Sequence, residues 1–287
     1  MKGVILAGGA GTRLYPLTQI ISKQLLPIYD KPLIHYPLAT LMAAQIREIL
    51  IITSPKDHSL FRELFGTGES LGVSIDYAIQ DAPKGIPDAF IIAEQFLAGD
   101  SVCLVLGDNI FFGPGLGRQL VQYHNVQGAQ IFGYHVSDPE RYGIATVNSI
   151  GEVTDLREKP KKPDSNIAIT GLYFFDNSVT ELSKHLSPGK RGETEIIDIL
   201  SAYHKKQSLE LEILPRGSAW LDTGTFESMN DASNFVRVLE ERQGLKMACL
   251  EEIAWRNSWI TTTDLLNLAS KYSNPLGDYL RILTKTK

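Results

Sequence analysis

The start of the fold is determined by the stretch Val4-Ile5-Leu6-Ala7-Gly8-Gly9-Ala10-Gly11-Thr12-Arg13-Leu14. Its four aliphatic residues predict a short buried strand. The three glycines that follow predict a tight turn whose backbone can approach a ligand closely. Arg13 adds a planar cationic group that matches phosphate oxygens. Because open α/β sheets bind ligands beyond the carboxyl ends of their strands, this segment predicts a phosphate-binding loop after the first strand.

Two well-known phosphate-binding motifs do not fit this loop. A P-loop needs Gly-Lys-Ser/Thr where this chain has Gly11-Thr12-Arg13, and a dinucleotide fingerprint beginning at Gly9 needs a glycine in place of Leu14. A plain strand-to-helix turn without a ligand is the simplest alternative for a glycine-rich loop. The arginine directly after the glycines favours phosphate binding.

Outward from this loop, aliphatic runs alternate with helix-like stretches. Strands are predicted at residues 4–7, 49–53, 73–79 and 101–106, and helices at 33–45, 57–65 and 87–97. Such alternation is typical of βαβ units around a parallel sheet, and the near-continuous apolar strands indicate helices on both faces. We therefore predict an α/β fold with a Rossmann-like, mostly parallel sheet flanked by helices.

The pattern changes from about residue 142. Further strands are predicted at residues 143–147, 152–156, 167–175 and 209–214, with a helix at 195–206 and another that Thr225 caps and that ends near 241. The last forty-odd residues indicate a helical appendix. The second part of the chain is therefore expected to be a mixed lobe followed by this appendix.

Composition excludes several classes of protein. The chain has 287 residues, of which 43% are hydrophobic and 21% charged, which is enough for a full core. A net charge of −5 argues against a general nucleic-acid-binding surface. No apolar run approaches the roughly 18 residues of a membrane span, and no signal peptide is indicated. Cys103 and Cys249 lie far apart, so we expect a reducing, cytoplasmic compartment without disulfides.

A second motif, Ser22-Lys23-Gln24-Leu25-Leu26-Pro27, follows the glycine loop. A lysine before an apolar pair is usually a surface residue with a buried stem. Together with the glycine loop, however, this motif resembles the signature of the sugar-phosphate nucleotidyltransferases, and its Lys-Gln form is similar to members that use dTTP and glucose 1-phosphate. The resemblance covers essentially the whole chain through the segments Tyr29-Asp30-Lys31-Pro32, Leu106-Gly107-Asp108-Asn109, Asp138-Pro139-Glu140-Arg141-Tyr142-Gly143, Glu158-Lys159-Pro160, Thr170-Gly171-Leu172-Tyr173, Arg191-Gly192-Glu193, Trp220-Leu221-Asp222-Thr223-Gly224-Thr225 and Glu251-Glu252-Ile253-Ala254-Trp255-Arg256.

The resemblance implies thymidylyl transfer from dTTP to α-D-glucose 1-phosphate, which releases pyrophosphate and gives dTDP-glucose. The attacking phosphate oxygen is already ionised near neutral pH, because the second pKa of a phosphomonoester is about 6. Catalysis then requires holding two polyanions together, which Arg, Lys and a divalent cation can do. By resemblance, Arg13 would hold the triphosphate, Lys23 the reacting phosphates, Lys159 the sugar phosphate, and Arg191 the phosphate region.

Asp108 and Asp222 are the candidate magnesium ligands. Each follows an apolar strand, and Mg²⁺ prefers one or two carboxylates together with phosphate oxygens and water. For either residue alone, a turn or capping aspartate is the commoner explanation, but the resemblance implies one shared Mg²⁺ site. An aspartic-protease interpretation of Asp222-Thr223-Gly224 needs two carboxylates that share a proton, and this tripeptide occurs once, although a dimer could supply the second.

The resemblance also implies contacts to the base and the sugar. A carboxamide at Gln80 can donate to thymine O4 and accept from N3–H, and because uracil presents the same edge, UTP should be tolerated. One departure is the pair Pro87-Asp88, where the family usually has Ala and then Gln or Glu. The implied nucleotide contacts are Gly8, Gly11, Thr12, Gln24, Gln80, Pro83, Gly85 and Asp108, and the implied sugar contacts are Tyr142, Gly143, Glu158, Thr170 and Tyr173.

The predicted organisation follows from these assignments. Residues 1–241 would form the nucleotidyltransferase domain, with a nucleotide-binding core at about 1–140 and a sugar-binding part at about 141–225. Residues 242–287 would form the helical appendix and an interface of a homotetramer. A second, inhibitory nucleotide site there would use Arg216 and Arg256. The alternatives are an enzyme for UTP or another hexose 1-phosphate, and a non-catalytic nucleotide-sugar sensor, which the joint presence of the basic and acidic candidates disfavours.

Overall fold

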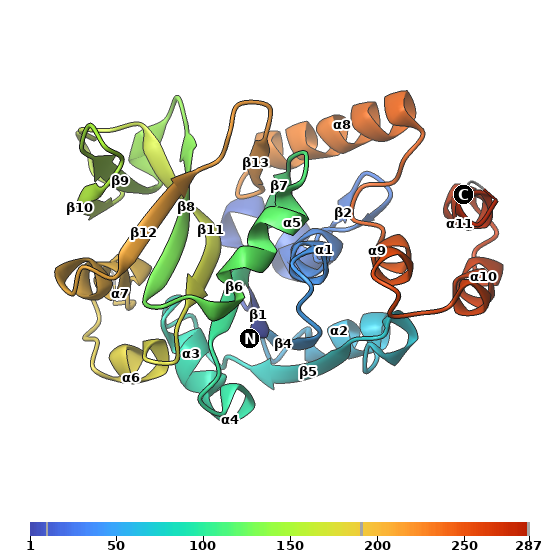
Figure 1. The fold of residues 1–287 in the computed structure, drawn as a ribbon, viewed down its shortest axis with the longest axis horizontal. Coiled ribbons are helices and arrows are strands. Elements are labelled where there is room, and N and C mark those ends of the chain that lie inside the picture. Colours follow the sequence, from blue (N-terminus) through green and yellow to red (C-terminus); the bar gives the residue numbers. More distant parts are fainter. Residues whose placement is uncertain (10, 190–191, 286–287) are drawn as a thin grey trace.

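The computed structural model describes residues 1–9, 11–189 and 192–285 and is shown in Figure 1. Within these ranges, nine strands form the central sheet in the order β10-β9-β11-β6-β1-β4-β5, with β8 paired to β11 and β12 paired to β8. The strands are β1 (Lys2–Ala7), β4 (Glu48–Thr53), β5 (Ser74–Ile79), β6 (Val102–Leu106), β8 (Ala129–His135), β9 (Gly143–Val147), β10 (Val153–Glu158), β11 (Ile167–Phe175) and β12 (Leu209–Ile213).

The first half of the sheet is parallel, as predicted. β1 lies between β4 and β6, with Ile5 opposite Ile51 and Val105, and β5 continues the parallel order beyond β4. The second half is mixed: β11 runs antiparallel to β6, β8 and β9, whereas β12 runs parallel to β8. The predicted α/β fold with a mixed second lobe is therefore confirmed.

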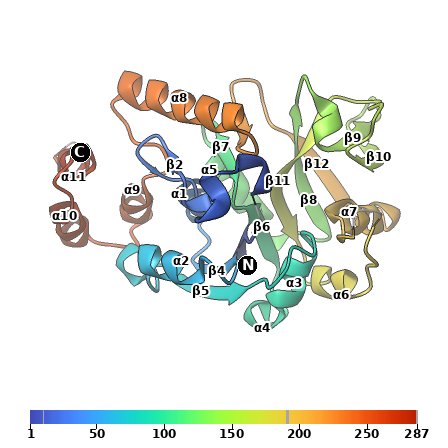
Figure 2. The same cartoon turned by 180° about the vertical axis from the view of Figure 1, so that it is seen from behind.

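Helices cover both faces of the sheet, as the figures show from the front and from behind (Figures 1 and 2). The helices are α1 (His35–Ala43), α2 (His58–Phe65), α3 (Asp88–Ile92), α4 (Glu94–Leu97), α5 (Leu116–Val121), α6 (Val179–Lys184), α7 (Ile196–Lys205), α8 (Phe226–Gln243), α9 (Leu250–Arg256), α10 (Thr262–Ser270) and α11 (Pro275–Leu283). None of those in the described part of the chain is long and apolar enough to cross a membrane.

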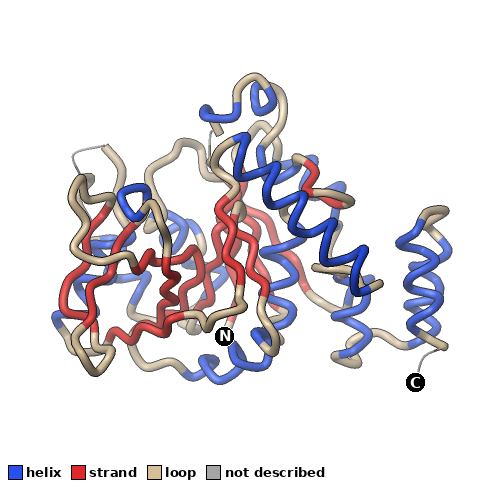
Figure 3. Tube along the Cα trace, turned by 90° about the horizontal axis from the view of Figure 1, so that it is seen from above, coloured by secondary structure: helices blue, strands red, loops and turns tan. Residues whose placement is uncertain are grey.

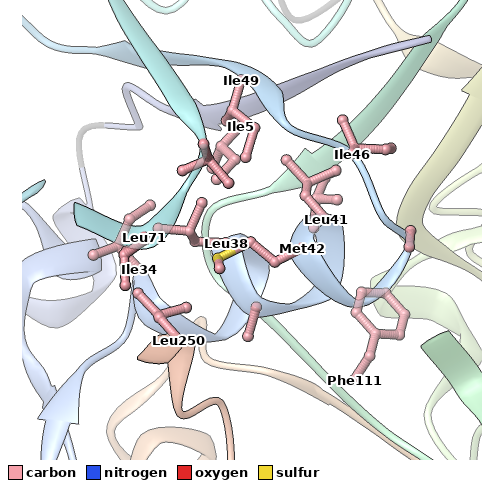
Figure 4. Packing of buried hydrophobic residues seen from close by; sticks show 14 of the residues in the cluster. Ile5, Ile34, Leu38, Leu41, Met42, Ile46, Ile49, Leu71, Phe111 and Leu250 are labelled. Carbon is pink, nitrogen blue, oxygen red and sulfur yellow. The ribbon is translucent and has the colours of Figure 1, made fainter. Parts of the chain in front are cut away.

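The two faces of β1 belong to two hydrophobic clusters, because successive strand residues point to opposite sides. Ile5 packs in the cluster that contains Leu38 and Leu41 of α1, which Figure 4 shows from close by. Val4 belongs to the cluster that contains Phe90 of α3 and residues of α7, such as Ile199. Burial on both faces fixes the direction of β1 and its position in the sheet. The position of the glycine loop that follows β1 is fixed with it.

Two small sheets complete the fold. β7 (Asn109–Phe112) pairs with β13 (Ala219–Asp222), and β2 (Pro27–Ile28) pairs with β3 (Lys31–Pro32). α8 begins as predicted at Thr225, whose side chain accepts a hydrogen bond from the backbone N–H of Ser228 in a capping box.

The C-terminal helices α10 and α11 lie at the end of the molecule opposite β9 and β10, and the view from above shows the same separation (Figures 1 and 3).

Two local predictions were wrong or incomplete. The helix expected at 87–97 is two short helices, α3 and α4, which meet at Ala93. The pattern also missed β8 and the short strands β2, β3, β7 and β13.

Candidate active site

The loop after β1 has the tight geometry that its glycines predict. Gly11 adopts φ +60°, and a Cβ there would lie 3.1 Å from the Thr18 side chain. The Thr18 hydroxyl donates a hydrogen bond of 2.7 Å to the Gly11 carbonyl. Residues 12–14 form a 3-10 turn in which Leu14 is buried and Arg13 is exposed. The loop therefore anchors itself through Leu14 and presents the guanidinium of Arg13.

Arg13 faces a cleft made of two adjoining cavities. One has a volume of about 390 Å³ and lies against the glycine loop. The other, of about 170 Å³, lies between β6, β9, β11 and β13. The cavities share five lining residues and are therefore continuous: Arg13, Ile86, Glu158, Lys159 and Glu195.

Most of the predicted site residues line this cleft. The larger cavity is lined by the candidates Gly11, Thr12, Arg13, Lys23, Gln80, Pro83, Gly85, Glu158 and Lys159. The smaller cavity is lined by Asp108, Tyr142, Gly143, Tyr173 and Asp222, together with Arg13, Glu158 and Lys159. Residues far apart in the chain thus converge at the carboxyl end of β1.

A few candidates do not line either cavity. Gly8 lies beside the Gln80 side chain, and Gln24 is buried and accepts a hydrogen bond from the Ser22 hydroxyl. Thr170 is fully buried. Arg216 and Arg256 also lie outside the cleft lining, and the Arg256 guanidinium instead pairs with Glu252 at 2.7 Å. Arg191 lies outside the described residues.

The two candidate metal ligands are brought together by the pairing of β7 with β13. Asp108 follows β6, and Asp222 lies opposite Asn109 in the two-stranded sheet. The backbone N–H and the hydroxyl of Thr223 donate to the Asp108 carbonyl at 3.2 and 2.9 Å. These contacts place both carboxylates at the floor of the smaller cavity.

The charges around these carboxylates shift their pKa values in opposite directions. Burial alone would raise the pKa of Asp108, but the ion pair with Lys23 and a 2.9 Å hydrogen bond from Asn109 hold it below its ordinary value. Burial and the charge of Asp108 raise the pKa of Asp222, against the cations Lys23, Arg13 and Arg141. Among the described residues, Asp222 forms an ion pair with Arg141 at 3.8 Å.

This donor set fits a hard divalent cation. It consists of two neighbouring carboxylates, and burial together with the charge of Asp108 raises the pKa of Asp222. In the described ranges, no group of three or more His, Cys, Asp or Glu side chains could hold a metal. A cation at Asp108 and Asp222 would therefore take its other oxygens from substrate phosphates and water, as Mg²⁺ commonly does.

Asn109 was missed by the sequence analysis, although it stands directly after Asp108. Its side chain is buried, and its Oδ1 accepts hydrogen bonds from Trp220 Nε1 at 2.6 Å and from the Gly171 N–H at 3.1 Å. Because both partners can only donate, the amide group must turn its N–H₂ toward Asp108. Asn109 therefore orients the Asp108 carboxylate. Arg141, which lies in the segment 138–143 that carries the resemblance, was likewise not identified as a site residue.

The wall of the smaller cavity is formed by β9 and β10. Glu158 ends β10 opposite Gly143, where a Cβ would lie 3.3 Å from Glu158 Oε2. Lys159 follows with φ +43°, its backbone N–H donates to the Tyr142 carbonyl at 3.0 Å, and its half-exposed side chain lies 3.4 Å from Glu158. The ring of Tyr142 packs 5.1 Å from that of Trp220. This wall presents a carboxylate and an ammonium group to the same space.

The opposite rim depends on a glycine. Gly85 has φ +107°, and a Cβ there would lie 2.0 Å from the Thr194 carbonyl oxygen. The N–H and hydroxyl of Thr194 both donate to the Lys84 carbonyl at 2.9 Å. The loop at residues 83–85 is thus held against the segment that precedes α7.

Comparisons with known proteins agree with this geometry. Residues 2–238 match the family model described as nucleotidyl transferase. Curated proteins named glucose-1-phosphate thymidylyltransferase are 51% identical: one from Neisseria meningitidis over 99% of this chain and 100% of its own length, and one from Mycobacterium tuberculosis over 98% of both.

Solved structures give the same family. A Bacillus anthracis protein assigned as a glucose-1-phosphate thymidylyltransferase, crystallised with sucrose, is 37% identical with a TM-score of 0.77, over 83% of this chain and 95% of that one. A UDP-glucose pyrophosphorylase complexed with UDP-glucose is 25% identical with a TM-score of 0.73, over 83% and 98%. The chain belongs to the nucleotidyl transferase family.

Proposed function

We propose that this enzyme transfers the thymidylyl group of dTTP to α-D-glucose 1-phosphate, giving dTDP-glucose and pyrophosphate. The observation that carries the proposal is the continuous cleft in which Arg13, Lys23 and Lys159 face the carboxylates of Asp108 and Asp222. The 51% identity over nearly the whole chain to proteins of that name supports the choice of substrates.

The larger cavity would take the nucleotide and the smaller one the sugar phosphate. Gln80 and Gly85 line the larger cavity but not the smaller one, which suits a base, and Arg13 lines both cavities, which suits phosphates. Glu158 and Tyr173 in the smaller cavity offer polar groups for sugar hydroxyls. The two reactants would then meet where the cavities join.

The proposed step is an in-line displacement at the α-phosphorus. A phosphate oxygen of glucose 1-phosphate forms the new P–O bond, and the bond to the β-phosphate breaks to release pyrophosphate. No side chain has to remove a proton from the nucleophile, because it is already ionised. The residues act by position and charge: Arg13 and Lys23 stabilise the triphosphate and the leaving pyrophosphate, and Lys159 holds the sugar phosphate.

The family generally uses a divalent metal, and we propose Mg²⁺ at Asp108 and Asp222. Bound there, the ion would polarise phosphate oxygens and neutralise charge in the transition state. Lys23 already pairs with Asp108, so an ammonium group is held at the place where the phosphates would arrive. Asn109 would keep the Asp108 carboxylate facing the cleft.

A pyrophosphate-release assay tests the function. The wild-type chain is given each of dTTP, UTP, dCTP and ATP with glucose 1-phosphate, galactose 1-phosphate or mannose 1-phosphate, with Mg²⁺ or with EDTA. We expect the highest kcat/KM for dTTP with glucose 1-phosphate, weaker use of UTP, and no turnover in EDTA. A clear preference for UTP or another sugar phosphate would favour the related enzyme, and no release with any pair would favour the sensor.

Assembly and regulation remain predictions from the resemblance. We propose a cytoplasmic homotetramer whose C-terminal helices form an interface. A separate cavity of about 280 Å³ lies between α1, α5, the end of α8 and the segment before α9, and neither Arg216 nor Arg256 lines it. A second nucleotide site that uses these two arginines would therefore lie outside this cavity, and the molar mass measured by light scattering with and without dTDP-sugar tests the assembly.

A further inference from the structure

The carboxamide of Gln80 is the only side-chain amide of the described residues that lines the larger cavity. Gln80 follows β5, is 5% exposed, and its backbone N–H donates to the Thr53 carbonyl at 2.8 Å. Its side-chain Nε2 lies 2.9 Å from Asp88 Oδ2 and 3.5 Å from the Gly85 carbonyl oxygen. Both N–H groups of this amide are therefore engaged by protein oxygens.

The two neighbours decide which way the amide must face. A carboxylate and a backbone carbonyl can only accept hydrogen bonds, so both require the N–H₂ end of Gln80. The opposite orientation would place Oε1 against two oxygens, one of which carries a charge. No residue in the described part of the chain donates a hydrogen bond to Oε1, which lies beside Gly8, where a Cβ would be 3.0 Å away. The end of the amide left for a ligand is the acceptor.

Asp88 is held firmly enough to impose this orientation. It is the first residue of α3, directly after Pro87, whose φ of −57° suits a helix start. The next two residues of the helix, Ala89 and Phe90, are fully buried, and the Phe90 ring packs edge-on against Phe175 with 5.3 Å between centroids. The Asp88 carboxylate thus extends from a helix whose own position is fixed by the core.

We propose that Asp88 is a positioning residue that locks the Gln80 carboxamide with its oxygen toward the nucleobase, so that the site selects bases with an N–H at that position. This rests on the proposed function. Thymine and uracil carry N3–H, whereas N3 of cytosine is an acceptor that would meet Oε1 lone pair to lone pair. The two-point pairing expected between Gln80 and thymine is replaced by one hydrogen bond to N3–H, because the donor end is already engaged by Asp88.

The test is Asp88→Asn, which keeps the size of the side chain but removes its charge and adds a donor. With Asn at this position the Gln80 amide can rotate, since the new side chain can either accept from it or donate to it. We expect the ratio of kcat/KM for dTTP to that for dCTP to fall by about tenfold. The reason is that the rotated amide no longer sets its oxygen against the acceptor N3 of cytosine. The change should come from a rise in kcat/KM for dCTP while the value for dTTP changes little.

The controls separate this role from a general disturbance. Asp81→Asn removes the same charge from the exposed start of the same loop and should leave the ratio unchanged. Asp88→Glu retains a carboxylate that can accept from Gln80 and should keep most of the selection against dCTP. If Asp88→Asn does not fold, Asp88→Ala replaces it. This variant also removes the acceptor, and the same fall in the dTTP to dCTP ratio of kcat/KM is expected.

Each outcome is decisive. An unchanged ratio in Asp88→Asn, or an equal loss with both nucleotides, overturns the proposal, because a merely structural residue would affect both alike. A wild-type chain that releases no pyrophosphate from dTTP would instead refute the proposed function. In that case binding of thymidine and deoxycytidine triphosphates, measured by calorimetry for wild type and Asp88→Asn, still tests the orientation of Gln80, and an unchanged affinity ratio contradicts it.

Discussion

Lys23→Met removes the cation that faces the two acidic groups and keeps the length of the side chain. In the structure, the Lys23 ammonium pairs with Asp108, and the two side chains are 10% and 19% exposed. Loss of one preorganised charged contact to a transition state costs about 10²–10³ in turnover. We therefore expect kcat to fall by about 10²–10³, measured by pyrophosphate release at saturating dTTP and glucose 1-phosphate.

The same substitution should also lower the free energy of unfolding. Removing one partner of a fully buried ion pair costs about 3–5 kcal/mol, and an exposed pair contributes about 0–1 kcal/mol. Lys23 and Asp108 lie between these limits, so we expect a loss of about 2–3 kcal/mol in urea unfolding. Asp108→Asn should recover part of this loss in the double variant, because it removes the unpaired buried charge.

Lys31→Met is the matched control. The Lys31 side chain is 8% exposed, close to the 10% of Lys23, and it also pairs with carboxylates, those of Asp30 and Glu240, but it does not line the cleft. It should lower stability by a similar amount and leave kcat within about threefold of wild type. If Lys31→Met reduces kcat as much as Lys23→Met does, or if Lys23→Met keeps near-normal kcat, the catalytic role of Lys23 is refuted.

Three further predictions follow from the cleft and the core. Asp222→Asn removes one of the two proposed metal ligands, so turnover should fall by about 10²-fold and half-maximal activity should need more Mg²⁺, whereas an unchanged Mg²⁺ titration would exclude the site. Gly85→Ala forces a Cβ to within 2.0 Å of the Thr194 oxygen, so the rim must move and kcat/KM for dTTP should fall by about 10²-fold; wild-type kinetics would contradict the rigid rim. Burial lowers the pKa of His35 to about 4, so the folded state resists protonation and stability is lost as pH falls from 6.5 toward 4. Between pH 7 and 4.5, wild type should lose about 2–3 kcal/mol more unfolding free energy than His35→Leu, and equal losses would be inconsistent with a buried neutral imidazole.

Much of the cleft could be predicted because its residues follow strands. The rule that parallel strands present their carboxyl ends at one edge places Arg13, Gln80 and Asp108 near one another without any knowledge of the fold's details. The long βαβ pattern was equally informative, since burial on both faces leaves a clear apolar signature. These parts of the structure depend on local sequence.

Other parts depend on contacts between distant segments. Asp222 reaches Asp108 only because two four-residue strands, β7 and β13, pair, and such short strands carry little periodic signal. The orientation of Asn109 is set by donors from Trp220 and Gly171. The chemistry of the Gln80 amide was foreseeable, but its direction is decided by Asp88, a residue whose role the motif comparison left open.

The most direct measurement is a crystal structure of the chain with Mg²⁺, glucose 1-phosphate and a dTTP analogue that cannot be cleaved between its α- and β-phosphates. We expect the triphosphate beside Arg13 and Lys23, the sugar in the space bounded by Glu158 and Tyr173, and the metal between Asp108 and Asp222. Density for either reactant bound elsewhere, or a metal held without Asp108 and Asp222, would contradict this expectation.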